Sequence, residues 1–211
     1  MALPLTLPRL YAILDVHQMG ARSAGEVCAT LLSVGVRLFQ YRHKRGSSRQ
    51  VFDGVRPLIS MIRESGGLLI VNDRADIALA AHADGVHLGQ DDLPVDLARR
   101  VLPDGQYVGC STHNLDQLRH ADATSADYLA FGPIFPTASK EASDPAVGLA
   151  GLADARQATS KPLVAIGGIT VSNVRQAVEQ GADFVAVISG LLAVPDLADR
   201  AREFLSVLSG S

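Results

Sequence analysis

Residues 66–93 read GGLLIVNDRADIALAAHADGVHLGQDDL, and this stretch holds one complete unit of a parallel sheet. The aliphatic runs Leu68–Asn72 and Gly85–Leu88 have the length and character of strands buried on both faces. The segment RADIALAA between them has a helical composition. A strand, a helix and a second strand in this order predict two parallel strands joined by a helical crossover.

Six further runs of the same kind occur along the chain. They are Leu10–Leu14, Val36–Tyr41, Tyr107–Cys110, Tyr128–Phe131, Leu163–Ile166 and Phe184–Ile188. Helical patterns separate the runs, among them Ala24–Val34, Arg49–Glu64 and Val171–Gln180. Gly35, Gly66 and Gly181 each follow a helical stretch, where a left-handed residue is favoured.

Eight such units in 211 residues predict one α/β domain, a single (β/α)8 TIM barrel over residues 1–211. An open parallel sheet is the alternative. The sequence has no G-x-G-x-x-G motif after its first strand, which argues against a dinucleotide-binding form of that sheet.

Composition limits the classes of protein to which the chain can belong. Hydrophobic residues make up 47% and charged residues 19%, which favours a packed core over disorder. The net charge of −3 argues against a general nucleic-acid binder. We find no signal peptide and no apolar run of about 20 residues, so we expect a cytoplasmic protein without a membrane span. Cys28 and Cys110 suggest buried free thiols, and the oligomeric state is not indicated.

A basic cluster follows the second predicted strand, in the sequence Gln40-Tyr41-Arg42-His43-Lys44. Alternation along the chain puts Gln40, Arg42 and Lys44 on one side. In a barrel of this kind the chemistry lies at the C-terminal ends of the strands. Two cations beside an amide suit a diphosphate there, and a solvated basic turn is the alternative.

Two acidic residues, Asp73 and Asp92, follow adjacent predicted strands. Both can reach one ion, and carboxylates that leave room for water and substrate phosphate are typical Mg²⁺ ligands. Each could instead cap the helix that follows it. Their position opposite the basic cluster favours one bound Mg²⁺.

A second anion site is predicted near the last three strands. The long irregular stretch 132–148 offers Thr137, Ser139 and Lys140, whose hydroxyl and ammonium groups suit phosphate oxygens. Strand seven ends in Gly167-Gly168 and strand eight in Ile188-Ser189-Gly190, where backbone N–H groups can approach a phosphate. A simple tight turn at 167–168 is the alternative.

The fifth predicted strand ends in Cys110-Ser111-Thr112-His113. Ser111 could bind a substrate or cap the next helix. His87 and His113 are either acid–base candidates or hydrogen-bonded structural groups. No Ser–His–Asp arrangement can be inferred from the spacing.

Taken in order, several motifs resemble the thiamine-phosphate synthase family. They are LYAILD (10–15), QYRHK (40–44), VNDRADIALAAHADGVHLGQDDL (71–93), GCSTH (109–113), DYLAFGPIFPTASK (127–140), PLVAIGGIT (162–170) and GADFVAVISG (181–190). Each motif is weak alone, but their order and spacing are specific and cover essentially the whole chain.

The resemblance implies a TIM-barrel transferase of thiamine biosynthesis. Such an enzyme couples a hydroxymethylpyrimidine diphosphate to a thiazole phosphate and releases thiamine phosphate and diphosphate. Diphosphate would leave first, giving a pyrimidine cation that the thiazole nitrogen attacks. Positioning and charge stabilisation would then carry the catalysis.

The resemblance also implies a set of site residues. Asp73 and Asp92 would hold one Mg²⁺, while Arg42, Lys44 and Lys140 would neutralise the leaving group. The pyrimidine diphosphate would contact Gln40, Tyr41, Arg42, His43, Lys44, Asn72, Ser111 and Lys140. The thiazole phosphate would contact Thr137, Ala138, Ser139, Gly168, Ile188 and Ser189.

Two residues depart from the family pattern. Ser139 stands where Thr is frequent, and His43 stands where an acid is common. The rival functions are a thiazole tautomerase-like isomerase on the same fold, which would use a histidine near His113, and a non-catalytic binding protein. The paired acids and the basic cluster favour the synthase.

Overall fold

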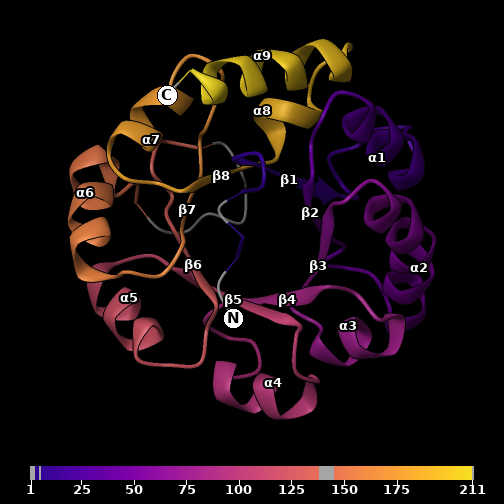
Figure 1. Cartoon of the computed structure of the whole chain (residues 1–211), viewed down its shortest axis with the longest axis horizontal. Helices are drawn as coiled ribbons and strands as arrows, with labels where there is room; N and C mark the ends of the chain where they lie inside the picture. Colours follow the sequence, from indigo (N-terminus) through magenta and orange to yellow (C-terminus); the bar gives the residue numbers. More distant parts are fainter. Residues whose placement is uncertain (1–2, 5, 138–144, 211) are drawn as a thin grey trace.

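The computed structural model describes residues 3–4, 6–137 and 145–210. Within these residues, eight parallel strands pair in chain order, and β8 pairs with β1 to close a barrel. The helices form a ring around the strands (Figure 1). The predicted TIM barrel is therefore confirmed, and the open sheet is wrong because Tyr11 of the first strand lies in register with Ala186 of the last.

Strands and helices alternate along the described chain up to β8, which is followed by two helices. The strands are β1 (Leu10–Asp15), β2 (Leu38–Arg42), β3 (Leu68–Asn72), β4 (Gly85–Leu88), β5 (Tyr107–Thr112), β6 (Tyr128–Phe131), β7 (Leu163–Ile166) and β8 (Phe184–Val187). The helices are α1 (Ala24–Ser33), α2 (Ser48–Glu64), α3 (Ala75–Ala81), α4 (Val95–Val101), α5 (Leu115–Asp122), α6 (Gly148–Ala158), α7 (Val174–Glu179), α8 (Ser189–Leu192) and α9 (Leu197–Ser209).

The predicted elements agree with these bounds except at a few ends. β2 begins at Leu38 and not at Val36, because the Val36 N–H donates to the Leu31 carbonyl and so completes the end of α1. α7 begins at Val174 and not at Val171, because the Asn173 side chain accepts from the Thr170 N–H and holds a turn there. The glycines predicted after helices, at 35, 66 and 181, have φ of +103°, +73° and +97°. Cys28 and Cys110 are buried and free, as predicted.

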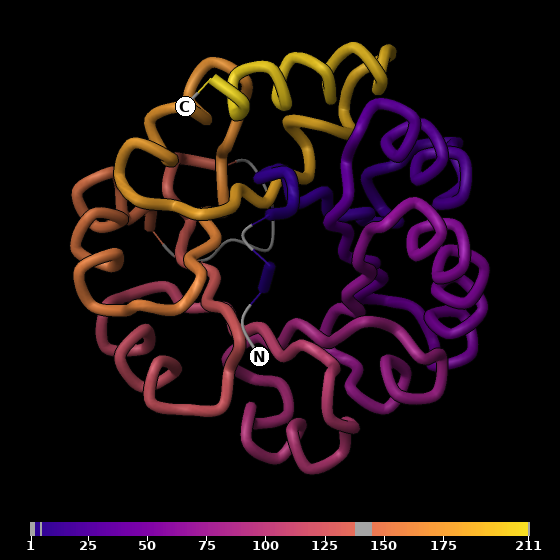
Figure 2. Tube along the Cα trace, in the orientation of Figure 1, coloured from indigo at the N-terminus to yellow at the C-terminus, as the bar shows by residue number. Residues whose placement is uncertain are grey.

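Two apolar layers surround the sheet, one on each side. The larger layer fills the space between strands and helices. The smaller cluster fills the inside of the barrel and includes Tyr11, Tyr107, Tyr128 and Phe184. Leu3 packs into it from the segment before β1, and this segment crosses the middle of the ring (Figure 2). No helix in the described ranges is long and apolar enough to cross a membrane.

A repeated acidic clamp ties neighbouring strands together at their N-terminal ends. Asp84, Asp127 and Asp183 immediately precede β4, β6 and β8. Each carboxylate accepts from a backbone N–H at or near the start of the preceding strand, at 2.8 Å in all three cases. Each also pairs with an arginine from the last turn of a helix: Arg63, Arg99 and Arg156 respectively. The clamp sets the register of each strand pair.

Asp127→Ala should destabilise the fold by about 2–4 kcal/mol, because it leaves the Val108 N–H without its acceptor and removes the carboxylate beside Arg99, which keeps its two carbonyl acceptors. Asp116→Ala is the control, since its side chain is 85% exposed in the pair with Arg119, and it should cost less than about 0.5 kcal/mol. Urea unfolding measures both free energies. Similar losses for the two variants would rule out the clamp as a stabilising device.

Candidate active site

Polar side chains facing the inside of the barrel gather at the C-terminal ends of β2, β3 and β5. Leu38, Ile70 and Tyr107 belong to the interior cluster. Alternation places on the same face the residues two or four positions further on. These are Gln40, Arg42, Asn72 and Ser111. The structure therefore brings together side chains that the sequence predicted separately on three strands.

Arg42 is held by a residue that the sequence analysis missed. The Asp15 carboxylate, at the end of β1, pairs with the Arg42 guanidinium and is only 1% exposed. Its other oxygen accepts from the His17 N–H at 2.9 Å. A buried carboxylate restricts the guanidinium to one orientation at the mouth of the barrel. The signal was the acid that ends LYAILD, the last residue of the first strand motif.

Lys44, Asp73 and Asp92 form one cluster at the ends of β2, β3 and β4. Lys44 Nζ lies 2.7 Å from Asp73 Oδ2. The pKa of Asp73 lies above its usual value, chiefly because the carboxyl is buried. The nearby Asp92 carboxyl also raises this pKa, and the Lys44 ammonium opposes the rise only in part. Two acids and one lysine leave the cluster with an excess of negative charge, which a cation would balance.

Neither acid of this cluster caps a helix, so that alternative is wrong. Asp73 has a φ of +65°, precedes the helix cap and donates its N–H to the His87 carbonyl at 2.8 Å. The cap of α3 is Arg74, which makes no side-chain capping bond. Asp92 Oδ2 accepts from the Gly89 N–H at 2.7 Å and so fixes its own loop. The left-handed backbone of Asp73 is strained for a residue with a Cβ, a feature common at functional sites.

A line of hydrogen bonds crosses the inside of the barrel and ends at Ser111. Gln40 Nε2 donates to the Tyr11 hydroxyl at 3.1 Å, and the Tyr11 and Tyr128 hydroxyls lie 3.0 Å apart. His87 Nδ1 is 3.0 Å from the Tyr128 hydroxyl, and His87 Nε2 is 2.8 Å from Ser111 Oγ. The Tyr128 and His87 rings also stack, with centroids 5.5 Å apart.

The contact between Ser111 and His87 is a serine–histidine pair that spacing did not predict. A catalytic pair of this kind needs a third group, usually a carboxylate, that keeps the ring nitrogen facing serine free to accept a proton. Here the third group is the Tyr128 hydroxyl. Ser111 does not cap α5, because Asn114 does. His113 Nδ1 bonds the Gly132 carbonyl at 2.8 Å, at the start of the long loop.

Gly168, Ile188 and Ser189, which were predicted to bind the second phosphate, lie at the ends of β7 and β8. The loop 132–137 packs on the end of β7: the Ile134 N–H donates to the Ile166 carbonyl at 2.8 Å, and the Phe135 N–H to Gly167 at 3.0 Å. A Cβ on Gly168, whose φ is +65°, would lie 2.6 Å from the Pro136 carbonyl oxygen. The loop itself therefore requires glycine at 168, whether or not a phosphate binds.

Of the remaining residues predicted for this second site, three are described by the structure and three are not. Ile188 caps α8 and is half-buried against the interior cluster, and Ser189 begins that helix. Thr137 is the last described residue before the gap at 138–144. Ala138, Ser139 and Lys140 lie outside the described residues.

Two predicted binding residues point away from the barrel interior. The buried Tyr41 ring belongs to the outer layer, and its hydroxyl fills the space that a Cβ on Gly54 would occupy. The His43 ring makes edge contacts with the rings of Tyr41 and His17. Any contact of Tyr41 with a substrate would therefore come from its backbone.

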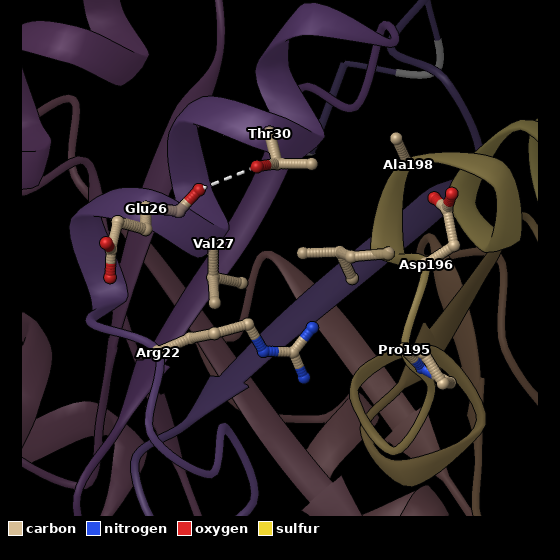
Figure 3. Close-up of a pocket in the computed structure, with 8 residues that line it drawn as sticks. Arg22, Glu26, Val27, Thr30, Pro195, Asp196 and Ala198 are labelled. Atoms are coloured by element: carbon tan, nitrogen blue, oxygen red, sulfur yellow. Dashed lines mark hydrogen bonds between the residues drawn. The ribbon is translucent and has the colours of Figure 1, made fainter.

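A cavity of about 480 Å³ lies away from these residues, between α1 and the segment that begins α9 (Figure 3). Arg22 reaches into it, but its guanidinium donates to the backbone carbonyls of Met19, Leu192 and Val194. The cavity therefore contains a structural arginine and none of the predicted site residues.

Comparison with known proteins identifies the family. Residues 10–191 match the family model described as thiamine monophosphate synthase. The chain is 49% identical to a thiamine-phosphate synthase of Koribacter versatilis, over 99% of both chains. It is 42% identical to that of Chloroflexus aurantiacus, over 95% of this chain and 93% of the other. A solved thiamine phosphate pyrophosphorylase of Pyrococcus furiosus superposes with a TM-score of 0.88 at 32% identity, covering 96% of each chain. The chain belongs to the thiamine monophosphate synthase family.

Proposed function

We propose that this chain couples a pyrimidine diphosphate to a thiazole phosphate, releasing thiamine phosphate and diphosphate. The observation that carries the proposal is the convergence of Arg42, Lys44, Asp73 and Asp92 at neighbouring strand ends. A leaving diphosphate needs positive charge beside it, and two oriented cations next to a pair of acids supply such a place. Family membership supports the same reaction.

The chain's own residues would act by holding charge beside the leaving group and by orienting the two substrates. Arg42, oriented by Asp15, and Lys44 would bind the diphosphate and stabilise the charge that develops as its bond to carbon breaks. Gln40, Asn72 and Ser111 would orient the pyrimidine. The thiazole phosphate would bind beside 167–168 and 188–189, with the thiazole nitrogen directed at the cationic carbon.

Mg²⁺ fits the donor set of the acidic cluster. Both candidate ligands are carboxylates, and the charge of the cluster is only partly balanced by Lys44. Among the described residues, no group of three or more His, Cys, Asp or Glu is placed to hold a metal. An ion held by two acids and completed by water and diphosphate oxygens is the usual arrangement for Mg²⁺. When bound, it would neutralise charge on the leaving group.

The isomerase alternative has no comparable support. A tautomerase needs neither the paired acids nor the cations, and the relatives described above carry the synthase name. A non-catalytic binding protein would likewise need no apparatus for a leaving group. The cytoplasmic location and the absence of a nucleic-acid partner stay predictions.

Product identification tests the proposed function. The purified chain is incubated with both substrates and Mg²⁺, and phosphorus NMR follows the products. We expect thiamine phosphate and diphosphate in equal amounts, each requiring both substrates. Isomerisation of the thiazole, or binding of both ligands without turnover, would point to one of the alternatives.

Asp92→Asn should raise the Mg²⁺ concentration needed for half-maximal turnover by at least about tenfold, because a ligand charge is lost. The variant should stay folded, since an amide oxygen can still accept from the Gly89 N–H. Asp91→Asn, which removes the same charge from the neighbouring exposed residue, is the matched control. Direct Mn²⁺ binding and turnover at limiting Mg²⁺ are measured for both, and equal behaviour of the two variants would dismiss Asp92 as a ligand.

Lys44→Gln should lower kcat/KM for the pyrimidine diphosphate by roughly 30- to 1000-fold, the effect of losing a charge-assisted contact worth about 2–4 kcal/mol. The affinity for thiazole phosphate should hardly change, because that site lies across the barrel. Arg45→Gln removes an exposed charge one residue away and serves as the control. Steady-state kinetics with each substrate varied in turn measure both effects. A fall in kcat/KM confined to thiazole phosphate would contradict a role of Lys44 in binding the diphosphate.

A further inference from the structure

Five polar side chains form a continuous line inside the barrel, from Gln40 through Tyr11, Tyr128 and His87 to Ser111. They come from β2, β1, β6, β4 and β5, so the line links five of the eight strands. Tyr11 and Tyr128 are at most 1% exposed and His87 is 6% exposed. Buried polar groups at this depth are costly unless each hydrogen has an acceptor.

The protonation state of the three buried members is fixed by burial. It raises the pKa of both phenols far above neutrality, so each hydroxyl keeps its proton. It lowers the pKa of the His87 imidazole from 6.5 to about 4, so the ring is neutral at pH 7. A neutral imidazole has one donor nitrogen and one acceptor nitrogen.

Only one direction of the line satisfies every hydrogen. The Tyr11 oxygen accepts from the Gln40 amide, so the proton of Tyr11 must go to the Tyr128 oxygen. The Tyr128 proton then goes to His87 Nδ1, which leaves the proton of the ring on Nε2. His87 Nε2 therefore donates to Ser111 Oγ. In the opposite direction the buried Tyr11 hydroxyl would have a proton with no acceptor among the residues that the structure describes.

We propose that this line of hydrogen bonds fixes the Ser111 hydroxyl as a hydrogen-bond donor toward the pyrimidine diphosphate, with Tyr128 and His87 as positioning residues. Its oxygen is occupied by the His87 N–H, so its own proton is available to an acceptor atom of the substrate. The same direction prevents His87 from taking the proton of Ser111, so the pair does not generate a serine nucleophile. The inference rests on the proposed function, because it assigns a role toward that substrate.

The tautomer of His87 tests the direction in the unmodified protein without substrate. Nitrogen NMR of protein labelled at histidine distinguishes a protonated Nε2 from a protonated Nδ1. The signal of His87, one of six histidines, is assigned by its loss in His87→Gln. We expect the proton on Nε2. A proton on Nδ1 would overturn the proposed direction.

Three tyrosine variants test whether the line of hydrogen bonds positions the Ser111 hydroxyl for turnover. Tyr128→Phe removes only the hydroxyl that donates to His87, and we expect kcat to fall about tenfold with KM for thiazole phosphate unchanged. Tyr11→Phe should lower kcat by less than Tyr128→Phe, because the Tyr128 hydroxyl can still donate to His87. Tyr107→Phe, a hydroxyl removed from the same interior cluster but not from the line, is the matched control and should stay within about twofold.

A double-mutant cycle separates positioning from a general structural effect. In a Ser111→Ala background, Tyr128→Phe should change kcat by less than about twofold, because the group it positions is gone. An equal loss in both backgrounds would overturn the link through Ser111. Should Tyr128→Phe fail to fold, the tautomer measurement still decides the direction. Failure of the proposed function would be seen separately, because the unmodified protein would then not couple the two substrates.

Discussion

The pairing of β1 with β8 is the constraint on which the rest of the molecule depends. Closure seals the inside of the sheet, so each interior polar group needs a partner within the barrel. Closure also brings all eight C-terminal strand ends to one mouth. The acids and cations at the ends of β2, β3 and β4, such as Lys44 and Asp73, are neighbours because these strands pair directly. Closure of the barrel then sets them across the mouth from the ends of β7 and β8. At the opposite end, the clamps of Asp84, Asp127 and Asp183 hold the register that aligns them.

Strand positions could be predicted because parallel strands buried on both faces are unbroken aliphatic runs, as at 68–72 and 163–166. The pairing of Asp73 with Asp92 followed from adjacent strand ends. The pairing of Tyr11 with Tyr128 could not be predicted, since these residues are 117 positions apart and meet only through closure. The role of Asp15 was missed for a similar reason, because its partner is set by strand register and not by local pattern.

The two halves of the mouth differ in the groups that they offer to a ligand. The ends of β1 to β4 hold charges of both signs, fixed by Asp15 and by the Asp73 backbone, and suit a diphosphate that must leave. The ends of β7 and β8 offer glycine-rich backbone, which suits a phosphate that only anchors its substrate. The Ser111–His87 contact stands between them, and its third partner is a phenol and not a carboxylate. In the proposed direction of these hydrogen bonds, the described contacts would stabilise charge and would not supply a serine nucleophile.

In the proposed reaction the diphosphate departs before the new carbon–nitrogen bond forms. Secondary deuterium isotope effects on the methylene carbon of the pyrimidine substrate test it most directly, measured in a single turnover with both substrates saturating. Departure of diphosphate flattens that carbon and loosens its C–H bending. We expect a clearly normal isotope effect, with the dideuterated substrate reacting more slowly. An isotope effect near unity would mean that attack and departure occur together, and would contradict a cationic intermediate.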